Sequence, residues 1–170
     1  MKVEANGTYW YTDFITEGER LELKLWALEN EYKLKPNLAG PNRRFSRLDK
    51  LGKLPDIINI IRDRIIEVEQ IVNPVEAPQN ADWIGIQREG AFVEPHLDYN
   101  GEDPAYYTRR YNLLVNMPNE GGQPIYDGQT LDIGERTLWR CDAGIKIHSS
   151  VPNVGKRPRI NLSYGFLMPR

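Results

Sequence analysis

Cysteine and histidine are scarce in this chain. Its 170 residues include one cysteine, Cys141, and two histidines, His96 and His148. A single cysteine excludes an internal disulfide and fits a reducing compartment. With only two histidines, any site that needs imidazole groups must use one or both of them.

Long apolar runs and a charge excess are also missing. No stretch approaches the length of a membrane span, and Met1 to Tyr11 has no apolar segment typical of a secretory signal, so we expect a cytoplasmic protein without membrane contact. The formal net charge of −2 gives no broad attraction to nucleic acid, and no nucleic-acid partner is expected. The sequence does not indicate an oligomeric state.

The length and composition predict one soluble globular domain over residues 1–170, with 40% hydrophobic residues. Residues 1–75 read as a helical, supporting region. Within it, Ile58, Ile61, Ile65 and further apolar residues recur at helical spacing, which predicts a helix over Pro55–Val72 with Pro55 at the first helical position. Its apolar stripe is expected to pack on a sheet.

The rest of the N-terminal region is less regular. Thr8–Tyr11 is aromatic and predicts a strand, whereas Glu19–Tyr32 fits a strand or a helix equally well. Lys35–Lys53 reads as a loop. Its basic cluster, at Arg43, Arg44 and Arg47, is interpreted as solvated, with contact to an acidic substrate as the alternative.

Residues 76–170 change to short strands with turn punctuation, which is typical of an antiparallel sandwich or barrel. Asn100–Ala105 is expected to be a loop and Glu120–Gly122 a turn. The overall prediction is a mainly β (α+β) jelly-roll or cupin-like core with N-terminal helices packed on its sheet. The predicted strands are Trp83–Gln87, Ala91–Leu97, Arg110–Met117, Gln123–Tyr126, Thr130–Ile133, Thr137–Arg140, Gly144–His148 and Arg159–Phe166.

His96-Leu97-Asp98 is the first part of a candidate metal site. In an extended chain alternate side chains share a face, so His96 and Asp98 point to the same side. Two neighbouring ligands do not close a site, and the other histidine, His148, is the natural third. Two histidines and one carboxylate form the facial set typical of non-haem Fe(II) sites. The alternative is that each histidine is an isolated surface or core residue.

Arg159 is the next candidate. In the predicted strand, Ile160, Leu162 and Tyr164 face one side, and Arg159 lies on the other with Asn161 and Ser163. An arginine on an inner face is costly unless it meets an anion, and its planar fork suits a carboxylate. Arg157 has the same strand parity and is a rival for this role.

Together these residues resemble a known family. His96-Leu97-Asp98, His148 and Arg159 are similar to the H-x-D…H…R pattern of Fe(II)/2-oxoglutarate-dependent dioxygenases, over roughly residues 83–166. The resemblance implies a double-stranded β-helix in which His96, Asp98 and His148 bind Fe(II). It also implies that Arg159 binds the C5 carboxylate of 2-oxoglutarate, assisted by Asn161 at a place where the family often has serine.

Two further stretches are similar to subgroups of this family. Arg110–Pro118 resembles a strand of the aspartyl/asparaginyl β-hydroxylase-like and proline hydroxylase-like proteins, in which a histidine helps to hold the cosubstrate. The matching residue here is Asn112. Gly121-Gly122 is similar to a turn of prolyl-4-hydroxylase-like members, although these use lysine where this chain has Arg159.

The resemblance implies a hydroxylase that uses Fe(II), O₂ and 2-oxoglutarate and releases succinate and CO₂. Related halogenases lack the carboxylate ligand, so Asp98 favours hydroxylation or another oxidation. The short chain suggests a small substrate, such as an amino acid that is free, carrier-bound or part of a peptide. A possible lid spans Tyr99–Arg109, and the candidate substrate contacts are Tyr99, Asn100, Arg110 and Arg157.

Three other classes stay open at this point. One is a cupin-like protein that binds another metal or has no oxygenase activity. A nucleic-acid demethylase-like oxygenase is disfavoured because the chain has no basic stripe interleaved with aromatic residues. A pure interaction module gives no reason for the order of His96, Asp98 and His148.

Overall fold

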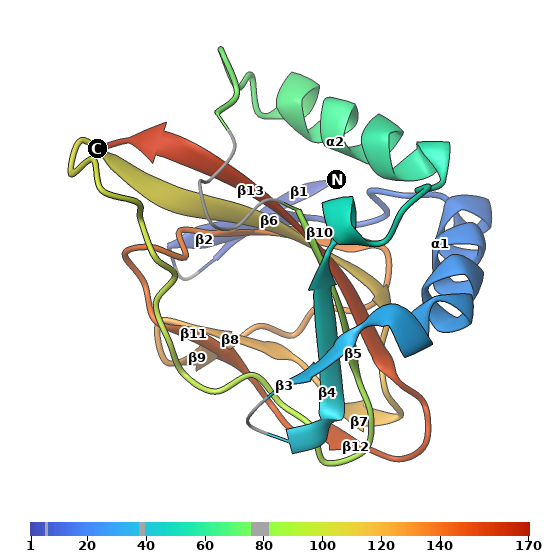
Figure 1. The fold of residues 1–170 in the computed structure, drawn as a ribbon. Helices are drawn as coiled ribbons and strands as arrows, with labels where there is room; N and C mark the ends of the chain where they lie inside the picture. The colour runs from blue at the N-terminus through green and yellow to red at the C-terminus, as the bar shows by residue number, and fades with distance from the viewer. Residues whose placement is uncertain (6, 38–39, 76–81) are drawn as a thin grey trace.

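The computed structural model describes residues 1–5, 7–37, 40–75 and 82–170 (Figure 1). In this part of the chain, the helices are α1 (Glu17–Glu29) and α2 (Asp56–Val68), with 3₁₀ turns at Glu31–Lys33 and Leu48–Lys50. The strands are β1 (Lys2–Ala5), β2 (Thr8–Tyr11), β3 (Lys35–Asn37), β4 (Gly40–Arg47), β5 (Trp83–Gln87), β6 (Tyr106–Asn116), β7 (Glu120–Gly121), β8 (Pro124–Tyr126), β9 (Gln129–Thr130), β10 (Thr137–Cys141), β11 (His148–Ser150), β12 (Asn153–Val154) and β13 (Arg159–Pro169).

The ambiguous segment near residue 20 is helical because its first turn is capped. The Thr16 side chain accepts from the Glu19 backbone N–H, and the Glu19 carboxylate accepts from the Thr16 N–H, which is a capping box. The same Glu19 carboxylate binds Arg64 of α2, so the cap of α1 also connects the two helices. In α2, Pro55 is the N-cap rather than the first helical residue.

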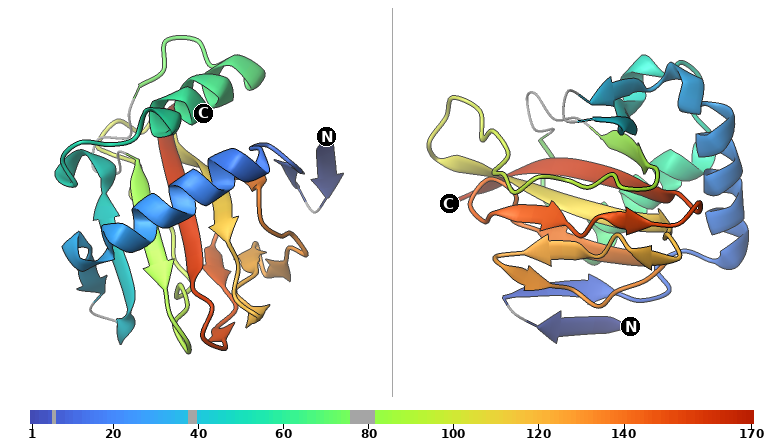
Figure 2. Two further views of the ribbon diagram at one scale, coloured as in Figure 1. Left: turned by 90° about the vertical axis from the view of Figure 1, so that its right-hand side faces the viewer. Right: turned by 90° about the horizontal axis from the view of Figure 1, so that it is seen from below.

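An eight-stranded antiparallel sheet is the main framework, with the order β1-β2-β10-β6-β13-β5-β4-β3. Its centre is the long pair β6 and β13. Two smaller sheets, β11-β8-β9 and β12-β7, complete the β structure. The fold is therefore mainly β, as predicted. Figure 2 shows the helices on one side of the large sheet and the small sheets on the other.

The two faces of the large sheet differ in chemistry. One hydrophobic cluster combines Leu23 of α1, Ile61 of α2 and the sheet residues Ile84, Leu113 and Leu162. The alternation predicted for β13 is confirmed, because Ile160, Leu162 and Tyr164 belong to this cluster whereas Arg159, Asn161 and Ser163 line a cavity on the other face. One face of the large sheet therefore lines the cavity with polar side chains, and the opposite face packs its apolar side chains in the core.

The prediction of a loop over Lys35–Lys53 is wrong. This segment contains β3 and β4, and β4 pairs with β5 in the large sheet. The polar residues of β4 do not alternate with apolar ones, which is why the strand was not visible in the sequence. The region described as helical therefore also supplies β1, β2, β3 and β4 to the sheet.

The prediction of a strand over Ala91–Leu97 is also wrong, because this stretch forms an isolated bridge at His96 and single backbone hydrogen bonds at Ala91 and Val93, without a continuous ladder. Pro95 has no N–H for a ladder. Gly144–Ile147 is a turn that precedes β11, and the strand predicted over Thr130–Ile133 is reduced to Gln129–Thr130. Glu120–Gly121 forms β7, with Gly121 and Gly122 at positive φ where they turn the chain.

The predicted boundary at residue 76, and the turn residues Ala77 to Asn80 beside it, lie outside the described residues. No helix in the described part of the chain is both long and apolar enough to cross a membrane.

Candidate metal and carboxylate site

The two histidines meet as direct cross-strand partners. His96 and His148 form an antiparallel bridge in which the His96 N–H donates to the His148 carbonyl at 3.1 Å and the reverse bond measures 3.0 Å. Residues opposite each other in such a pair present their side chains on one face. The ring centroids lie 4.2 Å apart. Residues fifty-two positions apart in the sequence thus share one point in space.

Asp98 joins the two imidazoles. Its backbone N–H donates to the Ala143 carbonyl at 2.8 Å, which holds the segment after His96 in place. Asp98 Oδ1 lies 3.3 Å from His96 Nε2 and 3.6 Å from His148 Nε2. Neighbouring ligands of an octahedral ion with bonds of about 2.1 Å lie about 3.0 Å apart. The three donor atoms all lie within 4.8 Å of one another, so they form a candidate site for one divalent ion.

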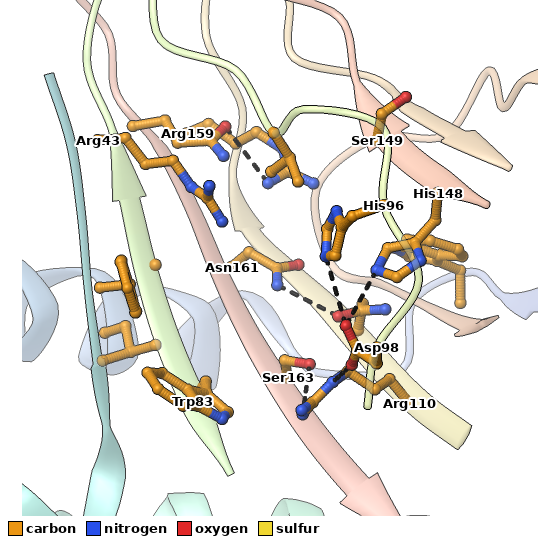
Figure 3. Close-up of a pocket in the computed structure, with 17 residues that line it drawn as sticks. Arg43, Trp83, His96, Asp98, Arg110, His148, Ser149, Arg159, Asn161 and Ser163 are labelled. Atoms are coloured by element: carbon orange, nitrogen blue, oxygen red, sulfur yellow. Dashed lines mark hydrogen bonds and ion pairs between the residues drawn. The ribbon is translucent and has the colours of Figure 1, made fainter. Parts of the chain in front are cut away.

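The outer nitrogens of the imidazoles fix which atoms are available. His96 Nδ1 lies 2.7 Å from the Glu94 carbonyl and His148 Nδ1 lies 3.4 Å from the Lys146 carbonyl. An Nδ1–H that donates to a carbonyl leaves Nε2 unprotonated in the neutral ring, which is the usual state of a metal-binding histidine. Both Nε2 atoms face Asp98 Oδ1 (Figure 3).

The electrostatics of the triad prepare it for a cation. Burial, and then the charge of His96, lower the pKa of His148 to about 4. The hydrogen bond to Asp98 raises the pKa of His96, which favours a second proton on Nε2 in the metal-free protein; a bound metal ion would replace this proton. Burial raises the pKa of Asp98, but the hydrogen bond from His96 and the charge of Arg110 outweigh it and hold this pKa well below its usual range. At neutral pH Asp98 is ionised and His148 is neutral, as metal binding requires.

A cavity of about 290 Å³ opens beside the triad. Its lining comes from the polar face of β4, β5, β6, β10 and β13, and from the segment around His96 and His148 (Figure 3). Phe45 and Trp83 form one apolar wall, with ring centroids 5.2 Å apart. The volume lies at the small end of ligand sites, so it suits small molecules or single side chains.

Four buried polar atoms of the lining have no hydrogen-bond partner among the described residues: Arg159 Nε, Asn161 Oδ1, Trp83 Nε1 and Trp139 Nε1. Buried polar groups are rarely left unpaired in a finished site. The cavity is therefore built for a ligand that supplies both acceptors and donors.

Among these groups, Arg159 has the greatest need for a partner, because it carries a charge. It is 5% exposed and its NH1 reaches Gln87 Oε1 only at 3.5 Å. Burial, and then the charge of Arg43, lower the pKa of Arg159 to about 10, which still leaves it charged at neutral pH. No carboxylate of the described residues forms an ion pair with it. A buried, unpaired guanidinium fits the carboxylate of a ligand.

Asn161 lies between Arg159 and the triad in Figure 3, and Asn112 is its hydrogen-bond partner. Both line the cavity, and Asn161 Nδ2 donates to Asn112 Oδ1 at 3.4 Å. The other atom of this amide, Asn161 Oδ1, has no partner in the described chain. Arg110 also lines the cavity, with its Nε donating to Asp98 Oδ2 and its NH1 to Ser163 Oγ at 3.4 Å.

The structure does not place the other predicted substrate contacts in the lining. Tyr99 is half exposed and lies outside the cavity. The Asn100 amide is used within the chain, where it accepts from the Thr108 N–H and donates to the Gly144 carbonyl. Arg157 is paired with Glu135 outside the cavity, so it does not compete with Arg159.

The segment predicted as a lid is also shorter than expected. Residues 106–109 belong to β6, which leaves 99–105 as the connection. Within β6, Tyr107 is buried beside Arg109.

Sequence reasoning missed several lining residues. Arg43 and Phe45 were assigned to a solvated loop, and Trp83, Gln87 and Trp139 were placed on strands without a role. For β5, the alternation of Ile84 and Ile86 with Trp83, Gly85 and Gln87 would have identified the lining face. For β4 no signal existed, because it has no apolar face to reveal its period.

The likeness of this chain to known proteins is found in its structure and not in its sequence. No family model matches the sequence, and no curated protein matches it. A prolyl-4-hydroxylase from Pseudomonas putida superposes with a TM-score of 0.67 at 17% identity, over 98% of this chain and 94% of that chain. This likeness covers nearly the whole of both chains.

The chain has the fold of the 2-oxoglutarate-dependent non-haem oxygenases. Two further structures agree with this. The epimerase SnoN, solved with Fe³⁺, alpha-ketoglutarate and nogalamycin RO, gives a TM-score of 0.72 at 14% identity, over 96% of this chain and 79% of that chain. HygX from Streptomyces hygroscopicus, solved with nickel, 2-oxoglutarate and hygromycin B, gives 0.69 at 11% identity, over 94% and 82%. The predicted resemblance is thus confirmed at the level of the fold.

Proposed function

We propose that this protein is an Fe(II)- and 2-oxoglutarate-dependent oxygenase that hydroxylates an unactivated C–H bond of an amino acid or a similar small molecule. The substrate would be free, carrier-bound or part of a peptide. One observation carries the proposal: a His-Asp-His donor set and a buried, unpaired arginine line the same cavity. The fold shared with oxygenases solved with a metal and 2-oxoglutarate supports it.

In this proposal His96, Asp98 and His148 hold Fe(II), and Arg159 binds the distal carboxylate of 2-oxoglutarate. Bound Fe(II) and 2-oxoglutarate, with O₂, supply the oxidising power for C–H cleavage, while the cosubstrate leaves as succinate and CO₂. The protein holds the metal ligands and the cosubstrate in position. The Glu94 and Lys146 carbonyls orient the two imidazoles, and three protein ligands would leave further positions of the ion for the cosubstrate and O₂.

Asn161 and Asn112 are assigned to the cosubstrate as well. Both line the cavity, and the unpaired Asn161 Oδ1 and the Asn112 amide offer hydrogen bonds to a ligand between Arg159 and the triad. The aromatic wall of Phe45 and Trp83 shields this path from water. Exclusion of water strengthens the pairing of Arg159 with a carboxylate.

The substrate class follows from the size of the cavity. Once a cosubstrate occupies part of about 290 Å³, the remaining space suits a small molecule or one side chain. The name of the Pseudomonas putida neighbour, a prolyl-4-hydroxylase, agrees with a residue-sized substrate. SnoN is named as an epimerase, so this fold also serves reactions other than hydroxylation, and the hydroxylation itself is part of the proposal.

A screen for succinate release tests this function. Free amino acids and short peptides are incubated with Fe(II), O₂ and 2-oxoglutarate, and succinate is measured beside the oxidised product. We expect at least one substrate to stimulate succinate release in the wild type, and Asp98→Ala to abolish it while circular dichroism shows an intact fold. Metal binding without any response to 2-oxoglutarate would favour the cupin-like alternative instead.

A further inference from the structure

Arg43 and Arg159 lie in one row across three strands. In the register of the large sheet, Arg43 of β4 is opposite Gln87 of β5, and Gln87 is opposite Arg159 of β13. All three side chains line the cavity. Neighbouring strands are about 4.8 Å apart, so about 10 Å separates the two arginine backbones. Two arginine side chains easily converge across that distance, and Figure 3 shows both directed into the cavity.

Neither guanidinium has an acidic partner in the described part of the chain. The acidic residue of the lining is Asp98, which faces the histidines and Arg110 instead. Glu94 acts on Arg43 only through its charge, without an ion pair. Burial lowers the pKa of Arg43. Two like charges held together in a partly dry cavity repel each other, and an anion placed between them removes this cost.

We propose that Arg43 and Arg159 form a clamp for the distal carboxylate of 2-oxoglutarate, with Gln87 as the spacer between the two guanidinium groups. The clamp rests on the proposed function, because it takes the cosubstrate as its ligand. Arg43 is then a second cosubstrate-binding residue, supplied by a strand outside the H-x-D…H…R pattern. It makes the site selective for dicarboxylic oxo acids over monocarboxylic ones.

Within the row, Arg159 is held only weakly by Gln87. Gln87 Oε1 accepts from Arg159 NH1 at 3.5 Å, while Arg159 Nε has no partner among the described residues. A carboxylate has two oxygens with about four lone pairs, so it can accept from both guanidinium groups at once. The metal end of the same ligand is fixed by the triad, so the clamp sets the length of oxo acid that spans the cavity.

The test measures binding rather than turnover. The Ni(II)-loaded protein is titrated by calorimetry with 2-oxoglutarate and with 2-oxopentanoate, which has the same five-carbon chain but no distal carboxylate. The variants are Arg43→Gln, Arg43→Lys and Arg159→Gln. Arg44→Gln is the matched control, because Arg44 is the next residue of β4, lies outside the lining and donates to the Leu34 carbonyl.

We expect Arg43→Gln to weaken 2-oxoglutarate binding at least about tenfold and to change 2-oxopentanoate binding less than about twofold. Arg43→Lys keeps the charge and should fall between Arg43→Gln and the wild type. Arg44→Gln should bind both acids as the wild type does. Thermal unfolding of each variant by circular dichroism shows that the fold is retained.

Two results would overturn the clamp. If Arg43→Gln binds 2-oxoglutarate as tightly as the wild type, Arg43 faces another ligand, such as an anionic primary substrate. If it weakens both acids equally, its role is not specific to the distal carboxylate. Failure of the proposed function looks different, because the Ni(II)-loaded wild type would then take up no 2-oxoglutarate at all.

Discussion

Arg110 binds Asp98 on the side of the carboxylate that faces away from the two histidines. Its Nε donates to Asp98 Oδ2, whereas Asp98 Oδ1 lies 3.3 Å from His96 Nε2 and 3.6 Å from His148 Nε2. The carboxylate therefore offers one oxygen to a metal ion and has the other held by a guanidinium. Partners of this kind orient metal ligands and tune their affinity.

Replacement of Arg110 tests this arrangement. Arg110→Gln should lower the affinity for Fe(II) or Ni(II) about 10- to 100-fold, because Asp98 loses the partner that orients it. Isothermal titration calorimetry under anaerobic conditions measures this, with Arg157→Gln as a control arginine outside the cavity. Equal metal affinities for Arg110→Gln and the wild type would show that Arg110 does not position Asp98.

Calorimetric titration also distinguishes the roles of Arg159 and Arg157 in binding 2-oxoglutarate. Arg159→Gln should raise the dissociation constant for 2-oxoglutarate at least about tenfold, since a buried charge-assisted bond to the ligand is lost. Arg157→Gln should leave this constant unchanged, because Arg157 is paired with Glu135 outside the cavity. The opposite pattern would assign the carboxylate to Arg157.

Much of the triad could be predicted because the residue types are rare and the geometry is local. His96 and Asp98 are two residues apart, so any extended backbone places them together, and the chain has a single further histidine. The contact of His96 with His148 was an inference from type alone. The sequence does not show that the two residues are backbone partners, because the segment before His96 forms no strand.

The wall of the cavity could not be predicted for a different reason. A strand is recognised by apolar residues at every second position, and β4 has Arg43 and Phe45 on one face with Arg44 and Ser46 on the other. One of these faces lines a polar cavity, so the hydrophobic pattern is absent where the strand is functional. The alternation in β5 and β13 was readable because their other face packs in the core.

Gly85 provides a test of the cavity floor. It lies in register between Phe45 of β4 and Asn161 of β13, and a Cβ there would meet only the Arg44 carbonyl oxygen at 4.0 Å. Gly85→Val should fold with equal or slightly greater stability, because valine favours strands by up to about 1 kcal/mol. Its methyl groups would fill part of the cavity and should weaken 2-oxoglutarate binding to the Ni(II)-loaded protein.

The control for this change is Gly134→Val, at an exposed position with no atom within 4 Å of an added Cβ. Calorimetry gives the binding and urea denaturation gives the stability. Unaltered 2-oxoglutarate binding in Gly85→Val would mean that the ligand does not use this part of the cavity.

Asp142 links the site to the pH dependence of stability. It accepts from Arg109 Nε and from Arg140 NH2, each at 2.6 Å, next to the Ala143 carbonyl that holds Asp98. Burial raises the pKa of Asp142, but the hydrogen bonds from Arg140 and Arg109 outweigh it and lower this pKa below its ordinary value. A lowered carboxyl pKa stabilises the folded state above the unfolded pKa and loses this effect as the pH falls.

Asp142→Asn should therefore lower the free energy of unfolding by about 2 kcal/mol at pH 7, since two guanidinium groups lose their anion. The difference from the wild type should shrink as the pH falls below about 4, because Asp142 of the unfolded chain then binds a proton before Asp142 of the folded protein does. Urea denaturation between pH 7 and pH 3.5 measures both values. A difference that stays constant over this range would contradict the assigned role of the Asp142 charge.

The direct measurement is an anaerobic titration of the wild-type protein with Fe(II) and 2-oxoglutarate, followed by visible absorption. If His96, Asp98 and His148 bind the metal and Arg159 holds the cosubstrate against it, a weak charge-transfer band appears only when both are present. The band should be absent from Asp98→Ala. A wild-type spectrum that stays unchanged on addition of 2-oxoglutarate to the Fe(II)-loaded protein would contradict the central claim.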